Sequence, residues 1–389
     1  MRFVFISLLF LLPLFCQGQD NILLTDPRIQ LECLEAVDSM YNFNFEVAEK
    51  QYNWLKQKYP EHPLPYFLLG LNEWWKILPN EYVKDYDKSF EGYMDQAIKK
   101  AKILYKKDKF NPEATFFLSA SYGFKARLNS ERGNYPAATF NAKKSLNFML
   151  ENQESNPELL PEFMFGTALY NYFRAWVPEN KKFMKPVLIV FPKGNKELGI
   201  EQLETVASES FYTRIEAMRY LVKIYSTYEK NYRKAWHYIT YLHELYPKNA
   251  YFTRIFITIG YKTHHKKECI QACQEAIQYV KNDEIGYENE TGRISSFVLG
   301  YYQDQNKDYE NAAYNFKECI RYTEMPNSYS TGYTVMGIEK LAKYAIDKED
   351  YKEAFYYYLK IKELSKDKRS ESFKEAKKYV RQNKKEYKQ

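Results

Sequence analysis

Pairs of small residues twelve positions apart recur along the chain, each pair among large apolar residues and around a short polar stretch. The segment SSFVLGYYQDQNKDYENAAYNFKECI shows the pattern, with Gly300 and Ala312 flanking its polar centre. The other pairs are Ala36 with Ala48, Gly260 with Ala272, and Ala342 with Ala354. A small residue on each of two antiparallel helices lets the helices approach closely, and a large neighbour fills the remaining space. The pattern therefore predicts pairs of helices joined by polar turns.

These units repeat with a spacing that is typical of helical solenoids. The second small residue of three successive pairs is Ala272, Ala312 and Ala354, so the unit recurs after 40 and then 42 residues. Repeats of this length, each built from two helices, stack so that every unit contacts its neighbours. Composition agrees, because 14 glycines and 15 prolines are few for the turns of a β-rich fold of 389 residues.

Several segments resemble the tetratricopeptide repeat (TPR) family. VLGYY with NAAYNF, and KLAKYAIDKEDYKEAFYYY, match both helices of a TPR unit. FEVAEKQYNWLKQKYPEHP and YRKAWHYITYLHELYPKNA match the second helix, with Pro60 and Pro247 in the closing position, and PYFLLGLNEWW and EFMFGTALYNYF match the first. The resemblance covers most of residues 30–365 and implies an all-α fold, an α-solenoid of antiparallel helix pairs in a TPR-like superhelix. The units exceed the usual length of about 34 residues, and an insertion falls between Gly70 and Ala97.

The periodicity breaks once, in the middle of the chain. Residues 177–204 contain Pro186 and Pro192 around the apolar run VLIVF, which predicts an extended segment. It is either a linker between two helical stacks or a loop that lines the groove. GNKELG has the glycine spacing of a phosphate-binding loop, but Ile200 and Glu201 follow it in place of Lys and Ser or Thr, which argues against nucleotide binding.

The predicted organisation therefore has five parts. They are a signal peptide (1–18), N-terminal TPR-like repeats (19–176), an irregular insertion (177–204), C-terminal TPR-like repeats (205–365) and a basic capping helix or tail (366–389).

The first residues predict export from a bacterial cell. Arg2 precedes an apolar run from Phe3 to Phe15, which is shorter than the roughly 20 residues of a membrane span and contains Pro13. Such a sequence is typical of a signal peptide, and we expect cleavage after Gly18 and release to the periplasm or medium. Lipid modification of Cys16 is the alternative, although the bulky residue before it is unfavourable.

The positive charge lies mainly at the C-terminus. The formal net charge is +7, and residues 363–389 hold ten Lys or Arg against five Asp or Glu. A nucleic-acid-binding protein spreads positive charge over a folded face, so we expect no nucleic-acid partner. Phe373, Ala376 and Val380 recur at helical spacing, which predicts a final helix with a solvated basic face. Contact with anionic lipid through this tail is the alternative, and it is the one expected route to a membrane.

No pattern in the sequence predicts catalysis. His265, Cys269 and Cys273 lie at i, i+4 and i+8, but the outer two are about 12 Å apart along a helix, too far for all three to bind one ion. We expect Cys269 and Cys273, with Cys33 and Cys319, to pack as unpaired thiols. The segment HELYP lacks the second histidine of a zinc-protease helix, and no G-x-S-x-G motif occurs. The sequence thus predicts no enzyme, metal or cofactor.

The leading prediction is an exported scaffold that binds a protein or peptide. A glycan-binding protein of the cell envelope, with some of the 38 tyrosines as stacking platforms, is one alternative, and a component of an envelope assembly machine is another. The TPR resemblance implies that the first helix of each pair lines a concave groove. The positions expected to be exposed in this groove are Arg254, Ile257, Tyr261, His264 and His265; Phe297, Tyr301, Asp304 and Gln305; and Glu339, Lys343, Ile346 and Asp347.

Within this set, Tyr261 and Tyr301 are expected to hold an extended or helical peptide, while Arg254 and Lys343 pair with its acidic groups. The set lacks the asparagines of carboxylate-clamp TPR domains, so capture of a peptide C-terminus is not implied. The alternative is that the two tyrosines only pack against the next repeat. His264 would make binding sensitive to pH if its partner is charged.

Overall fold

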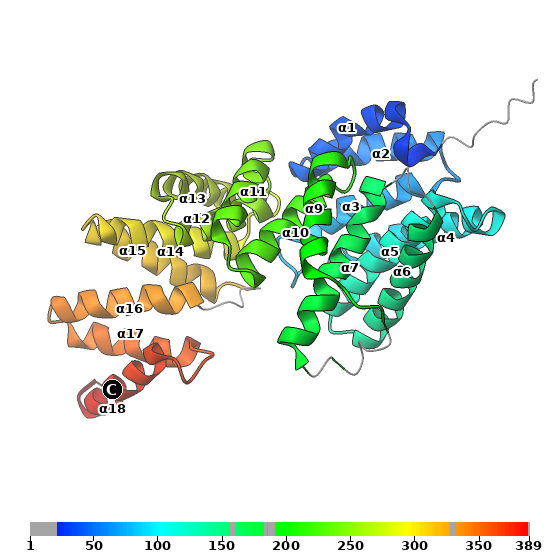
Figure 1. Cartoon of the computed structure of the whole chain (residues 1–389). Helices are drawn as coiled ribbons and strands as arrows, with labels where there is room; N and C mark the ends of the chain where they lie inside the picture. Colours follow the sequence, from blue (N-terminus) through cyan, green and yellow to red (C-terminus); the bar gives the residue numbers. More distant parts are fainter. Residues whose placement is uncertain (1–21, 156–159, 183–184, 186–190, 327–331, 388–389) are drawn as a thin grey trace, which may run out of the picture.

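The structure is a computed structural model that describes residues 22–155, 160–182, 185, 191–326 and 332–387. The predicted signal peptide, its cleavage site and Cys16 lie outside these residues, as does most of the VLIVF run. Within the described part the longer elements are all helices (Figure 1). They are α1 (Pro27–Tyr41), α2 (Phe45–Lys58), α3 (Pro63–Ile77), α4 (Asp87–Lys107), α5 (Pro112–Glu131), α6 (Tyr135–Ser155), α7 (Leu160–Asn180), α9 (Lys196–Glu209), α10 (Arg214–Lys223), α11 (Tyr232–Leu245), α12 (Ala250–Lys262), α13 (Lys266–Lys281), α14 (Asn289–Gln305), α15 (Tyr309–Glu324), α16 (Gly332–Asp347), α17 (Tyr351–Leu364) and α18 (Glu371–Tyr387).

Successive helices pack antiparallel against one another, and the predicted α-solenoid of helix pairs is confirmed. The small residues do what their spacing indicates. A Cβ atom at Gly300 would lie 2.8 Å from the Phe316 ring, and one at Gly260 would lie 2.9 Å from the Trp236 ring. Both glycines therefore allow close helix contact, with a large aromatic side chain filling the space beside it.

Several of the short turns inside the pairs share one backbone feature. A single non-glycine residue adopts the left-handed conformation, for example Lys307 with φ 63° and Glu349 with φ 60°. In these two turns the next residue caps the following helix: the Asp308 carboxylate accepts from the Asn311 amide at 3.3 Å, and the Asp350 carboxylate accepts from the Glu353 amide at 2.9 Å. These caps satisfy amide groups that a helix start leaves unpaired, so each turn ends at a fixed residue.

The irregular segment in the middle is shorter than predicted. Residues 177–180 continue α7 and residues 196–204 belong to α9, so the prediction of an irregular 177–204 insertion is wrong at both ends. Gly194 and Gly199 explain the difference. A Cβ at Gly199 would lie 2.6 Å from the Tyr172 amide nitrogen, and one at Gly194 would lie 2.4 Å from the Asn171 carbonyl oxygen. The glycines of GNKELG thus let α9 pack directly on α7, and the break lies inside a helix pair.

Helices α1 to α12 form what we call the closed turn, because its first and last helices touch. The Asn249 side-chain amide donates to the Tyr41 carbonyl at 2.7 Å, and the Tyr246 hydroxyl donates to Asp38 at 2.9 Å. The loop 78–86, which is the insertion predicted between α3 and α4, joins this contact, since Arg254 donates to the Pro79 carbonyl at 2.7 Å. Partners about 200 residues apart in the sequence thus close the array on itself.

Side chains of the chain itself occupy the inner face of the closed turn. Trp74 is fully buried and meets Phe124 at 5.6 Å between ring centroids. The Arg127 guanidinium lies 4.7 Å from the centre of the Trp74 ring and 6.0 Å from that of Tyr220, and Phe165 meets Tyr220 at 5.8 Å. Helices α3, α5, α7 and α10 therefore turn their inner surfaces toward an aromatic interior.

Helices α13 to α18 continue the array beyond the closed turn. Figure 1 shows α14 to α18 following one another away from α1–α7, with the C-terminal helix at the far end. Among the described residues, no helix combines the length and the apolar character that a membrane crossing requires.

Candidate binding groove in the C-terminal helix pairs

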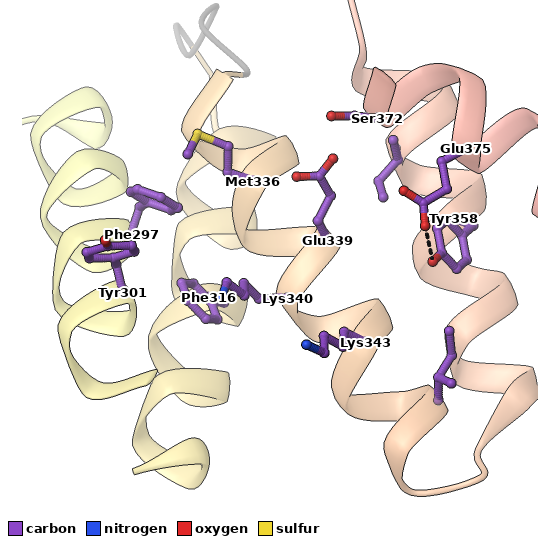
Figure 2. Close-up of a pocket in the computed structure, with 12 residues that line it drawn as sticks. Phe297, Tyr301, Phe316, Met336, Glu339, Lys340, Lys343, Tyr358, Ser372 and Glu375 are labelled. Atoms are coloured by element: carbon purple, nitrogen blue, oxygen red, sulfur yellow. Dashed lines mark hydrogen bonds between the residues drawn. The ribbon is translucent and has the colours of Figure 1, made fainter. Parts of the chain in front are cut away.

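A cavity of about 500 Å³ opens on the side of α16 that faces α14 and α18. Figure 2 shows its lining, which comes from five helices and combines an aromatic floor with a charged rim. We call it the C-terminal groove. It is lined by Phe297, Tyr301, Phe316, Met336, Glu339, Lys340, Lys343, Ile346, Tyr358, Ile361, Ser372 and Glu375.

The floor of the C-terminal groove is rigid. Phe316 is fully buried and Phe297 is 2% exposed, with 6.0 Å between their ring centroids. Gly300 and Gly337 lie on either side of Phe316, and a Cβ at Gly337 would lie 3.3 Å from its ring. The Phe316 ring thus sits between α14 and α16, where side chains at the two glycines would displace it.

An aromatic cluster supports the floor from the side of α12. Tyr261 meets Phe297 at 5.7 Å, Tyr301 at 4.9 Å and Tyr333 at 6.1 Å, with near-perpendicular rings in each case. Burial raises the pKa of Tyr261 to about 12, so its hydroxyl stays protonated at neutral pH. Edge-to-face packing of this kind holds the rings in place, so Tyr261 has a structural role beside the groove.

Two of the charged groups beside α16 neutralise each other. Lys340 donates to Asp304 at 2.7 Å, and the Tyr344 hydroxyl donates to the same carboxylate. Burial would raise the pKa of Asp304, but the hydrogen bonds from Lys340 and Tyr344 outweigh it and hold that pKa below its usual value. Asp304 therefore joins α14 to α16.

Two other charges remain available. Glu339 and Lys343 lie one helical turn apart on α16, and neither has an ion pair with another described residue. The Lys343 side chain is exposed, whereas Glu339 is half-buried. Residues four apart on a helix lie about 6 Å from each other, so α16 presents one negative and one positive group along the groove.

A second hollow of about 900 Å³ adjoins the first and shares Lys340 and Lys343 with it. Its lining comes from the end of α14 and from α15, α16 and α17. It is formed by Asp304, Tyr309, Glu310, Ala313, Tyr314, Lys317, Lys340, Leu341, Lys343, Tyr344, Ala345, Asp347, Lys348, Glu353 and Tyr357. Lys343 thus stands where the two hollows meet.

The groove positions predicted on α14 and α16 come together here, except Gln305, which lines neither hollow. Phe297, Tyr301 and Lys343 line the C-terminal groove, and Asp304 lines the second hollow. The expectation that Phe297 is exposed is wrong, because the ring forms the buried floor. Glu339 and Ile346 also line the groove, and Asp347 lines the second hollow.

The positions predicted on α12 have other surroundings. Arg254 binds the Pro79 carbonyl, and Ile257 is fully buried. His265 stacks on Trp236 with 4.0 Å between ring centroids, while His264 is the exposed left-handed residue of the turn, with φ 62°. These four residues do not line either hollow. The physical reason is that other parts of the closed turn engage these side chains: the loop 78–86 binds Arg254, and Trp236 of α11 stacks on His265.

Sequence reasoning missed the residues that complete the groove from other helices. Phe316 comes from α15, Tyr358 and Ile361 from α17, and Ser372 and Glu375 from α18. The Tyr358 hydroxyl donates to Glu375 at 3.2 Å and joins α17 to α18 (Figure 2). The sequence held one signal for such a residue: the large residue that follows the second small residue of a pair, here Phe316.

The cysteines pack in the interior. Cys33, Cys269, Cys273 and Cys319 are free and buried. Cys269 donates to the Ile257 carbonyl at 3.7 Å, and burial raises the pKa of its thiol to about 12, which keeps it protonated. Among the described residues, no group of three His, Cys, Asp or Glu side chains is arranged to hold a metal ion.

Comparisons with known proteins add little to this geometry. No family model and no curated protein matches the chain. It is similar to the crystal structure of the P58(IPK) TPR domain, with 13% identity and a TM-score of 0.25 over 92% of this chain and 99% of that one. It is also similar to yeast Tom70, with 11% identity and a TM-score of 0.24 over 92% and 96%.

At these TM-scores neither structure places the individual helices of this chain. The paired helices, the recurring small residues and the repeat lengths carry the assignment. The array is TPR-like.

Proposed function

We propose that this chain is a non-catalytic scaffold that binds a segment of a partner protein in the C-terminal groove. The observation that carries the proposal is the contrast between the two halves of the array. The closed turn fills its inner face with its own aromatic side chains, whereas the C-terminal groove is a hollow with a rigid apolar floor and two available charges. Hollows that combine buried aromatic anchors with a few polar groups are typical of protein interfaces.

The lining defines the chemistry of the bound segment. An apolar side chain can seat on Tyr301 and Ile346, which are half-buried above the floor, and Met336, 42% exposed, can adapt to its shape. Lys343 attracts an acidic group and Glu339 a basic one about a helical turn away. A segment with one apolar anchor between an acidic and a basic residue satisfies all three features.

In the C-terminal groove, a glycan ligand is less favoured by the aromatic geometry. Sugar stacking needs a ring face that is open to solvent. Phe297 is buried, and Tyr261 meets three other rings with its edges or face. A role in an envelope assembly machine is compatible with segment binding and differs from it only in the identity of the partner.

The proposal includes export. Its support is the interrupted apolar run from Phe3 to Phe15 with Gly18 after it. Mass-spectrometric sequencing of the purified native protein should find an N-terminus at Gln19. An intact Met1 or a lipid-modified Cys16 would contradict this part of the proposal and leave the groove untouched.

Site-directed photo-cross-linking tests the groove and identifies the partner. Met336 and Met325 are matched positions, since both are exposed methionines, at 42% and 37%, and Met336 alone lines the C-terminal groove. A photoreactive amino acid at position 336 should yield a discrete cross-linked partner in native extracts, and the same group at 325 should not. Equal labelling from both positions would refute groove binding.

A further inference from the structure

The last helix, α18, carries a row of basic side chains on its exposed side. Lys377, Lys378, Arg381, Lys384 and Lys385 are all exposed, and none has an acidic partner among the described residues. At about 100° per residue they fall within an arc of about 120° and extend about 12 Å along the helix. We call this row the basic face of α18.

The opposite side of α18 is buried in the array. Ala376 is fully buried and Val380 is 6% exposed, while Tyr379 stacks on Tyr358 of α17 with 4.2 Å between ring centroids. Tyr387 packs toward Phe355 at 5.9 Å. The apolar side chains of α18 are thus engaged in the fold, and they fix the basic face toward solvent.

The acidic residues of α18 lie off the basic face. Glu375 accepts from Tyr358 and lines the C-terminal groove, and Glu386 accepts from Tyr387. Glu371 pairs with Lys374 at 2.6 Å, at the start of the helix. Five positive charges therefore remain without compensation along one helix.

The arrangement fits an extended anionic surface better than a single anion. Five side chains in a row on one convex helix diverge, whereas a phosphate pocket needs donors that converge on one point. Four of the five are lysines, which act as hydrated point charges and lack the planar fork of arginine. Tyr379 and Tyr387 of α18 pack on α17, so neither ring is turned to the basic face for stacking on nucleic-acid bases.

We propose that the basic face of α18 binds the anionic headgroup plane of a phospholipid bilayer. The contact is electrostatic and peripheral, because the basic face contains no apolar residue that could insert. Figure 1 places α18 at the far end of the array, and the groove residues Ser372 and Glu375 lie on another side of the same helix. The C-terminal groove can therefore stay open while the basic face contacts lipid.

Vesicle sedimentation of the full chain tests this proposal. The chain should bind phosphatidylcholine vesicles that contain about one third phosphatidylglycerol at about 0.05 M salt, and should dissociate at about 0.5 M salt. Pure phosphatidylcholine vesicles should not bind it. Because each lost charge weakens attachment about fivefold, the variant Lys377→Gln/Lys378→Gln/Arg381→Gln should bind about one-hundredfold more weakly.

The matched control is Lys106→Gln/Lys107→Gln/Lys109→Gln, at the end of α4, which removes the same charge from three exposed lysines. It should leave vesicle binding within about twofold, and both variants should keep their helical content, since glutamine is a good helix former. Equal loss in the two variants, absence of binding at low salt, or binding that persists at high salt would overturn the proposal. Retention on heparin without vesicle binding would also overturn it, in favour of a sulfated polysaccharide.

Discussion

Gly300 lies where α14 crosses α15, and a side chain at this position would meet the ring of Phe316 and the Ala312 carbonyl oxygen. Gly92 in α4 is its opposite, since no atom lies within 4 Å of the place where its Cβ would be. The twelve-residue spacing could be read from the sequence because it follows from helix geometry. The role of Phe316 as the floor of the groove could not, because that depends on a third helix, α16, and on Gly337.

Replacement of these two glycines by alanine should change the stability of the fold in opposite directions. Gly300→Ala should destabilise the fold by about 1 to 3 kcal/mol, because the added methyl group overpacks a rigid site. Gly92→Ala should stabilise it by about 0.5 to 1 kcal/mol through helix propensity alone. Urea unfolding followed by circular dichroism measures both. A neutral Gly300→Ala variant would mean that Phe316 can move.

At the scale of helices, a carboxylate from α7 binds the backbone amides just before α10. Glu162, 5% exposed, accepts from the Phe211 amide at 2.7 Å, the Tyr212 amide at 2.8 Å and the Thr213 amide at 3.0 Å. The three amides belong to the turn just before Arg214, the first residue of α10, where they would otherwise lose their partner, and negative charge near a helix N-terminus is favourable. No local pattern could reveal this cap, since donor and acceptor lie about 50 residues apart in the sequence.

Removal of this cap should be costly. Glu162→Ala leaves buried amides unpaired, so we expect a loss on the order of 3 kcal/mol and faster hydrogen exchange at Phe211–Thr213. Glu201→Ala, on the exposed face of α9, should change stability by no more than about 0.5 kcal/mol. If both variants unfold at the same urea concentration, Glu162 does not hold α10 in place.

At the scale of the whole molecule, contacts between distant helices decide which face is open. Asn249 joins α12 to α1 through the Tyr41 carbonyl and also caps α12, accepting from the Phe252 amide at 3.0 Å. The TPR resemblance implied that the first helix of each pair lines a concave groove. It could not predict that α1–α3 would meet α10–α12, because closure depends on the small rotation added at every helix pair, which has no local sequence signature.

The contribution of the Asn249–Tyr41 hydrogen bond to stability can be measured by comparison with Asn231, which only caps a helix. Asn231 accepts from the Lys234 amide at 3.1 Å and is exposed, so Asn231→Ala should cost about 1 kcal/mol. Asn249→Ala removes a similar cap and also leaves a buried carbonyl without its donor, for a total of about 3 kcal/mol. Equal costs would show that the Asn249–Tyr41 contact adds nothing to closure.

Binding in the C-terminal groove is tested most directly by the affinity of two matched double variants for the cross-linked partner. Met336→Asp/Lys343→Glu alters the groove, and Met325→Asp/Lys267→Glu makes the same changes at exposed positions outside it. We predict that the first loses at least about tenfold in affinity, roughly 1.4 kcal/mol, while the second stays within about twofold. Unchanged affinity of the groove variant, with its helical content and melting temperature intact, would contradict binding at this site.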